Sequence, residues 1–149
     1  MIFMKRDYGI FQVGLKILLR KGDSVLFLRM DDNHYWDLPG GRIDNVEAET
    51  SLEKVIAREV REELGSAVKY SLGKPLFQYW RATKRQGKRM PILLTIYDAV
   101  WRSGEIKISH EHSAYQWIQP RRDRLKRKDF GRKEEYEIFK KYFAENYHA

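Results

Sequence analysis

Three glutamates, Glu59, Glu62 and Glu63, stand close together at spacings that bring their side chains to one side of a helix. Apolar residues recur around them every three or four positions, which marks the face of a helix that packs on the core: Leu52, Val55, Ile56, Val60 and Leu64. Glu59 and Glu63 fall on this apolar stripe and Glu62 at its edge, where a carboxylate is costly without compensation. We therefore expect the three acids to point inward or into a cleft.

Carboxylates placed this close repel one another unless a cation lies among them. A hard divalent ion such as Mg²⁺ prefers oxygen ligands, which carboxylates at positions i, i+3 and i+4 present to one spot. Such an ion neutralises charge on phosphate oxygens and activates water, while a spare carboxylate takes the proton. The pattern predicts a Mg²⁺ site, with Mn²⁺ as the alternative ion, and hydrolysis of a phosphoanhydride bond.

The other interpretation is a solvated helix held by pairs such as Arg58 with Glu62, each contributing a few tenths of a kcal/mol. That interpretation places the acids opposite the apolar stripe, whereas the sequence places them along it.

The surrounding segment, GGRIDNVEAETSLEKVIAREVREELG, resembles the Nudix box, whose usual form is Gly, five residues, Glu, seven residues, then Arg-Glu-apolar-x-Glu-Glu-x-Gly. The second half matches completely from Arg58 to Gly65, and the preceding Leu38-Pro39-Gly40-Gly41 matches the usual lead-in. One spacing departs from the pattern, because ten residues rather than seven separate Glu47 from Arg58. Either Glu47 or Glu49 could therefore act as the first glutamate, after a lengthened loop.

The resemblance implies roles for these residues. Metal ligation or general-base catalysis is implied for the acids of the helix, Glu59, Glu62 and Glu63. Arg58 is implied to orient a carboxylate, and the backbone carbonyl of Gly40 to be a further metal ligand.

A later segment, HEHSAYQWIQP, resembles the loop that supplies the base in some members of that family, so Glu111 is a candidate base or extra ligand. His110 and His112 flank it. No other local metal-ligand spacing accompanies these histidines, and we expect both at the surface.

Substrate contacts are expected from aromatic rings, which stack on bases, and from basic residues, which bind phosphates. The aromatic candidates are Tyr35, Trp36, Tyr79 and Trp80, although aromatic residues in strands commonly pack in the core. The basic candidates lie on one loop and could instead form a solvated hairpin tip: Arg81, Lys84, Arg85, Lys88 and Arg89. With Gly41, we take Trp36, Trp80, Arg81 and Arg89 as the substrate-binding set.

Several elements must position these residues. A β-hairpin is predicted over 11–19 and 24–30, and a helix from a cap at Thr50 or Ser51 to Gly65, with Thr50 and Glu53 spaced as a capping box. Strands are predicted over 76–82, 91–101 and 114–118, and an amphipathic helix near the C-terminus. The basic stretch 121–133 is expected to be a mobile surface segment, and the run 121–128 within it is expected to contribute to solubility or to RNA contact.

The length of 149 residues suits a single domain, 1–149. A net charge of +8 favours phosphate-bearing partners, namely nucleotides, RNA or anionic membranes. The absence of cysteine excludes disulfides and thiolate zinc sites. No signal peptide or bilayer-spanning stretch is evident, so we expect a cytoplasmic protein that does not enter membranes.

The resemblance implies an α+β fold, a three-layer α/β/α sandwich with a mixed β-sheet. It also implies hydrolysis of a nucleoside diphosphate linked to another moiety, with nucleoside triphosphates as the simplest small-molecule substrates. The alternatives are hydrolysis at the 5′ end of RNA and a non-catalytic module that binds nucleotides or RNA. The sequence leaves the oligomeric state open, a homodimer included.

Overall fold

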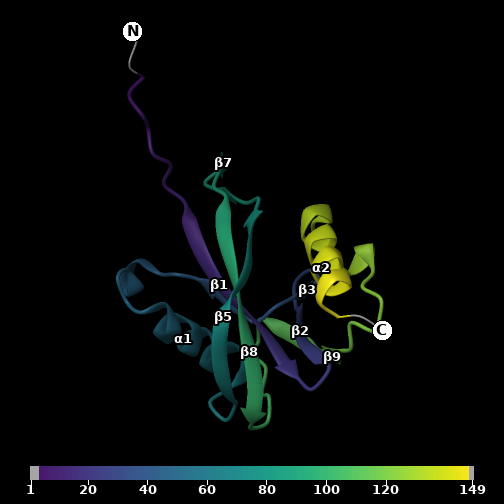
Figure 1. Ribbon diagram of the computed structural model, residues 1–149. Coiled ribbons are helices and arrows are strands. Elements are labelled where there is room, and N and C mark those ends of the chain that lie inside the picture. The colour runs from purple at the N-terminus through teal and green to yellow at the C-terminus, as the bar shows by residue number, and fades with distance from the viewer. Residues whose placement is uncertain (1–3, 148–149) are drawn as a thin grey trace.

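The computed structural model describes residues 4–147, and Figure 1 shows its elements in chain order. The strands are β1 (Gln12–Lys21), β2 (Ser24–Met30), β3 (Trp36–Asp37), β4 (Gly40–Arg42), β5 (Lys69–Arg81), β6 (Lys84–Arg85), β7 (Lys88–Arg89), β8 (Ile92–Ser103) and β9 (His112–Ile118). The helices are α1 (Leu52–Leu64) and α2 (Lys133–Asn146), with short 3-10 helices at Asn45–Glu47 and Arg127–Asp129.

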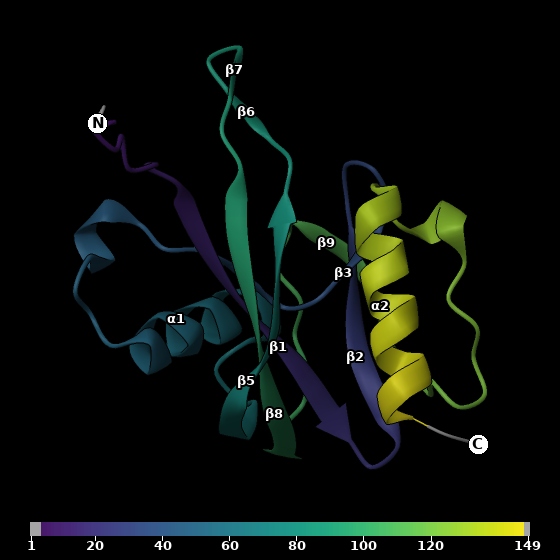
Figure 2. The same ribbon diagram turned by 45° about the horizontal axis from the view of Figure 1, so that its top comes forward.

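One mixed sheet contains seven of these strands. Its main order is β3-β2-β1-β8-β5, with β4 paired to β1 and β9 paired to β2. Strands β1 and β8 run parallel, and the other pairs of the sheet are antiparallel. The remaining strands, β6 and β7, form a separate hairpin that projects beyond the sheet (Figure 2).

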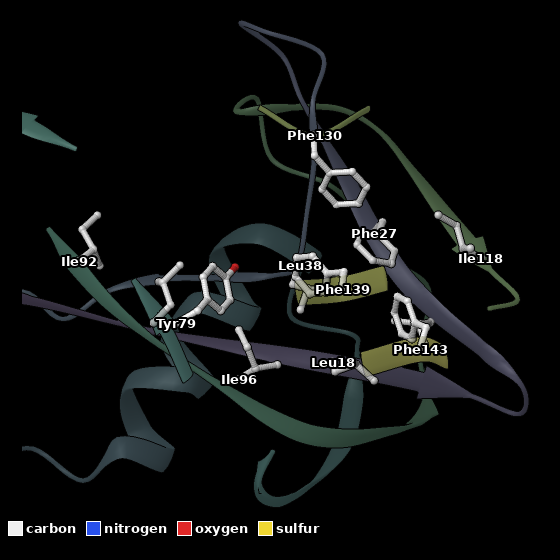
Figure 3. Packing of buried hydrophobic residues seen from close by; sticks show 12 residues of the cluster. Leu18, Phe27, Leu38, Tyr79, Ile92, Ile96, Ile118, Phe130, Phe139 and Phe143 are labelled. Atoms are coloured by element: carbon white, nitrogen blue, oxygen red, sulfur yellow. The ribbon is translucent and has the colours of Figure 1, made fainter. Parts of the chain in front are cut away.

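The two helices cover opposite faces of the sheet (Figure 2), because β1 alternates its buried side chains between them. Leu15, Ile17 and Leu19 pack in a cluster with the apolar stripe of α1. Leu18 faces the other way, into an aromatic cluster where the ring of Phe27 lies 5.8 Å from that of Phe139 on α2 (Figure 3). The expected three-layer α/β/α sandwich with a mixed sheet is confirmed.

Strands β1 and β2 pair only beside the turn that joins them, at Arg20 with Val25 and Lys21 with Ser24. Toward their other ends they diverge (Figure 2). There β1 pairs with β4 and β2 with β3, so the short connection from Asp37 to Gly40 lies between the two diverging strands. This opening places loop residues at the centre of the sheet, opposite the C-terminal half of α1.

Most predicted elements are present, and the main differences concern β5, the cap of α1 and the segment before α2. Strand β5 begins at Lys69, because pairing with β8 extends it through a stretch of low strand propensity. Ser51 rather than Thr50 caps α1, and the capping box lies instead at Asp44 and Glu47. The predicted surface segment 121–133 is anchored by Phe130, which is buried in the aromatic cluster.

Among the residues described, no helix combines the length and apolar character that crossing a bilayer requires.

Candidate active site

A cleft of about 430 Å³, here called the central cleft, lies between α1, the turn after β3 and the start of β9. Acidic and basic side chains meet in its wall, since Lys16 and Arg81 both pair with Asp37. The charged residues of its lining are Lys16, Asp37, Arg42, Glu59, Glu62, Glu63, Arg81, Glu111 and Arg132.

Two of the predicted acids form the floor of the central cleft. Glu59 and Glu63 are 8% and 7% exposed, since they lie on the apolar stripe of α1. The Gly40 N–H donates to Glu63 Oε2 at 2.8 Å, and a Cβ at Gly41 would lie 2.6 Å from Glu59 Oε1. Glycine at position 41 therefore allows the turn to approach the Glu59 carboxylate.

Burial controls the protonation of both acids. It raises the pKa of Glu63 to about 7, against the opposing effect of the Lys16 charge. It also raises the pKa of Glu59, although Arg58 opposes that rise. Both carboxylates are thus held in surroundings that disfavour a net negative charge without a nearby cation.

The third acid lines the same cleft but lies farther out than the buried pair. Glu62 is half-exposed at the edge of the stripe, and its carboxylate accepts from Arg58 Nη1 at 2.9 Å. A helical i,i+4 pair is within easy reach at this spacing, which directs Glu62 toward Arg58 rather than toward Glu63. Glu62 still lines the central cleft.

Arg58 contacts three carboxylates of the site. Its guanidinium contacts Glu47 at 2.6 Å, Glu59 at 2.8 Å and Glu62 at 2.9 Å. The contact with Glu47 is bidentate and lowers the pKa of that acid, whereas Glu49 is exposed with a φ of 68°. Of the two candidates for the first glutamate of the box, Glu47 is therefore the one that contacts the site.

The β9 end of the cleft holds the later acidic candidate. Glu111 is exposed, and its backbone carbonyl accepts from the Asp31 N–H at 2.9 Å. His110 is exposed as expected, but His112 is only 7% exposed and lines the cleft, which corrects the expectation of a surface residue. The correction follows from strand alternation, since His112 begins β9 with its side chain turned inward.

The predicted substrate residues are spread over several places. Gly41 and Arg81 line the central cleft, but the Arg81 guanidinium is held between the carboxylates of Asp37 and Glu135. Trp80 and Arg89 line a separate hollow of about 540 Å³ beside it.

The remaining aromatic candidates lie outside the central cleft. Trp36 packs against the aromatic core cluster, with the Arg29 guanidinium 4.7 Å from its ring. Tyr79 is buried in that cluster and donates to Glu135 at 3.2 Å, as expected of an aromatic residue in a strand.

A wider groove of about 1110 Å³ continues from the central cleft. The two cavities share Arg42, Glu62 and Glu111. The groove then passes between the loop 43–48 and the basic hairpin, where Lys84 and Arg85 line it. A ligand held at the acids could therefore extend toward the hairpin.

Sequence reasoning missed two residues on the cleft floor, Lys16 and Asp37. The signal for Lys16 was a charged residue inside the apolar strand segment VGLKILL. Asp37 carried no signal apart from its place before the Pro-Gly-Gly turn, because its charged partners Lys16 and Arg81 are far away in the sequence.

The donor set suits a hard cation. Carboxylates of Glu59 and Glu63 lie beside the turn that carries the Gly40 carbonyl, and all of these donors are oxygens. Over residues 4–147, no three His, Cys, Asp or Glu side chains form a ready-made metal cage. Mg²⁺ does not need one, because it keeps several waters and is usually held by one or two carboxylates together with substrate phosphates.

Comparisons with known proteins agree with this geometry. The sequence model of the NUDIX domain matches residues 11–141. The nucleoside triphosphatase NudI of Escherichia coli O139:H28 is 30% identical over 113 residues, which cover 69% of this chain and 78% of that protein.

Two solved structures share the fold. A MutT protein from Methanosarcina mazei Go1 has a TM-score of 0.67 at 24% identity, covering 92% of this chain and 96% of that one. A NUDIX hydrolase from Nitrosomonas europaea has a TM-score of 0.71 at 16% identity, covering 96% and 76%.

Proposed function

The chain belongs to the Nudix family of hydrolases, which act on nucleoside diphosphate derivatives, and from this premise we propose that it hydrolyses nucleoside triphosphates with Mg²⁺ in the central cleft. The observation that carries the proposal is the pair of buried carboxylates, Glu59 and Glu63, on the cleft floor. A relative named as a nucleoside triphosphatase, 30% identical, supports the choice of substrate. We assign the reaction to one domain containing the matched residues 11–141.

The acids of α1 would hold the cation. Glu59 and Glu63 supply carboxylate oxygens, the Gly40 carbonyl supplies a further one, and Arg58 fixes Glu59 through its 2.8 Å contact. When bound, a divalent cation neutralises charge on the phosphate oxygens and makes an attacking water more acidic.

A carboxylate must take the proton of the water that attacks phosphorus. Glu62 and Glu111 are exposed and line both the central cleft and the groove, so each can reach water beside the phosphates. The water O–H bond breaks as its oxygen attacks phosphorus, the proton passes to one of these carboxylates, and the phosphoanhydride oxygen departs with the leaving group.

The base and ribose of the nucleotide would occupy the hollow of about 540 Å³ beside the central cleft. Trp80 is half-exposed there, with the ring of Phe11 5.1 Å away and edge-on, so a base could stack on the free part of the indole. Arg89 of the same lining could contact a phosphate or ribose.

The test is a panel of nucleoside triphosphates, nucleotide sugars, ADP-ribose, dinucleoside polyphosphates and capped RNA, assayed with Mg²⁺ and with a chelator. We expect Mg²⁺-dependent release of a nucleoside monophosphate, or of another phosphate-containing product, from nucleoside triphosphates. Absence of turnover on the triphosphates would reject the proposal.

The choice of base is tested with two variants. Glu62→Gln and Glu111→Gln both keep the side-chain shape, and the variant that lacks the base should lose about 100-fold or more in kcat with little change in KM. Both acids are exposed, so both variants should keep the wild-type melting temperature. Unchanged kcat in both variants would overturn the assignment of the base to either residue.

A second candidate function is hydrolysis at the triphosphorylated 5′ end of RNA. It is favoured by the groove, which leads from the acids to the basic hairpin and is larger than the central cleft. Turnover of 5′-triphosphorylated RNA without turnover of free triphosphates would select it over the first candidate.

A further inference from the structure

Lys16 occupies an unusual place for a charged side chain. It lies in the middle of β1, the central strand that pairs with both β8 and β4, and its side chain is only 5% exposed. Its neighbours Leu15 and Ile17 face the apolar cluster under α1, so Lys16 points to the other face. There it meets the opening between the diverging strands, where the turn after β3 crosses.

The ammonium group of Lys16 is fully engaged by that turn. Its Nζ lies 3.0 Å from Asp37 Oδ2, 3.0 Å from the Leu38 carbonyl and 3.4 Å from the Gly40 carbonyl. An ammonium has three hydrogens to donate, and burying it is costly unless they are used. Three acceptors from one turn therefore satisfy one buried lysine.

The same turn carries the groups proposed to hold the cation. The Gly40 N–H fixes Glu63 at 2.8 Å, and the Gly40 carbonyl is itself a proposed ligand. Gly40 pairs with Lys16 in the sheet and has a φ of 133°, and a Cβ there would lie 2.2 Å from the Leu15 carbonyl. The backbone and the side chain of Lys16 thus act together on the position of Gly40.

The other partner of Lys16 is also fixed. Asp37 pairs with the Arg81 guanidinium at 3.2 Å, and Arg81 in turn pairs with Glu135 on α2. These buried ion pairs form a chain from α2 to the turn. The carboxylate that Lys16 contacts is therefore itself fixed by Arg81, so the contact between Lys16 and Asp37 restricts the position of the turn.

We propose that Lys16 is a positioning residue for the cation site, which sets the Gly40 carbonyl and, through the Gly40 N–H, the Glu63 carboxylate. That the Gly40 carbonyl and the Glu63 carboxylate are cation ligands rests on the proposed function. Because its hydrogens are directed to the turn, Lys16 acts through Gly40 and Glu63 and not on the nucleotide.

The test measures cation binding without substrate. Mn²⁺ binding to wild type and to Lys16→Met, a variant of similar length without charge, is followed by electron paramagnetic resonance. Loss of a residue that orients metal ligands typically weakens metal affinity by about 10- to 100-fold, so we expect the Kd for Mn²⁺ to rise at least tenfold. The Mg²⁺ concentration for half-maximal turnover should rise by a similar factor, with the KM for nucleotide at saturating Mg²⁺ within about twofold.

Lys21→Met is the matched control, because Lys21 ends the same strand but is exposed beside Trp101 and far from the turn. It should bind Mn²⁺ as the wild type does. A folded Lys16→Met variant with an unchanged Kd for Mn²⁺ overturns the proposal. An unchanged Kd with a raised KM for nucleotide also overturns it, since Lys16 would then contact the substrate.

If Lys16→Met does not fold, as judged by circular dichroism, Asp37→Asn replaces it. This variant keeps the shape of the side chain but removes the ionic partner of Lys16, and we expect a Kd for Mn²⁺ raised about threefold or more. An unchanged Kd overturns the proposal. A wild-type protein that binds Mn²⁺ but hydrolyses no nucleotide would reject the proposed function alone, because the binding comparison uses no nucleotide.

Discussion

Two buried carboxylates make the stability of this protein depend on pH, and His112, whose pKa is lowered by burial, acts in the opposite direction. Glu63 has a pKa of about 7 when folded and an ordinary value of 4.5, so between these values the folded chain keeps a proton that the unfolded chain has lost. Stability therefore falls as pH rises through this range, by at most roughly 1.4 kcal/mol per pH unit, and levels off above pH 7. Glu59 acts in the same direction.

We predict that in the presence of a chelator the free energy of unfolding declines from about pH 5 to pH 7, as measured by urea denaturation at several pH values. Glu63→Gln should flatten this decline, because glutamine does not titrate. Saturating Mg²⁺ should stabilise the wild type increasingly as pH rises, because the cation binds only the deprotonated acids. An equal decline in wild type and Glu63→Gln would contradict the assignment of the effect to Glu63.

At the scale of elements, α2 is connected to the site through charge as well as through packing. Glu135 is buried in the first turn of α2 and contacts Arg81, which in turn contacts Asp37 at the cleft. Although burial alone would raise it, the charges of Lys16 and Arg81 lower the pKa of Asp37 to about 2. Asp37 thus stays ionised over the physiological range.

Glu135→Gln should destabilise the fold by about 2 kcal/mol, because it removes one of the two carboxylates that pair with the partly buried Arg81. The adjacent Glu134 is exposed, so Glu134→Gln should change stability by no more than about 0.5 kcal/mol. Urea denaturation of both variants checks this difference. Equal stabilities would mean that the ion pairs contribute nothing net to the attachment of α2.

The elements that were predictable from sequence are those with sustained periodicity. Helix α1 repeats its apolar residues over thirteen positions, which also located Glu59 and Glu63 on the buried side. Strands β3 and β4 contain only two and three residues, too few for any period to show. They exist because β1 and β2 diverge and leave edges to be paired, which is a property of the sheet and not of the local sequence.

The ion pairs of the site were not predictable for a related reason. Asp37 meets Lys16, 21 positions earlier, and Arg81, 44 positions later, so no local spacing connects them. The sequence likewise offered both Thr50 and Ser51 as caps for α1, and in the structure Ser51 is the cap, with its Oγ accepting from the Lys54 N–H. The local sequence therefore indicated the candidate caps of α1, whereas the cap that is used and the ion-pair partners of Asp37 are known only from the structure.

At the scale of the whole molecule, the net charge of +8 is concentrated in two exposed runs. One is the β6–β7 hairpin at the groove, with Lys84, Arg85 and Lys88. The other, with Arg122, Arg124 and Lys126, lies in the loop that precedes α2, on the opposite side of that helix from the hairpin (Figure 2). Of these two runs, the hairpin is the one that lines the groove leading from the acids.

Replacing Lys84, Arg85 and Lys88 together by serine should therefore lower kcat/KM on 5′-triphosphorylated RNA by about tenfold or more, because the phosphates beyond the 5′ end would have no cations beside them. The salt dependence of that reaction should flatten by about 0.7 in the logarithmic slope for each phosphate that the variant no longer binds. Nucleoside triphosphates would fill only the central cleft and the hollow beside it, so their kcat/KM should stay within about twofold.

The matched variant with serine at 122, 124 and 126 should leave both reactions unchanged, since it removes the same charge far from the groove. An equal decrease in kcat/KM on both substrates in the hairpin variant would show that the hairpin acts on the triphosphate itself. Equal decreases in kcat/KM in the two triple variants would show that the hairpin acts only through the overall positive charge of the protein.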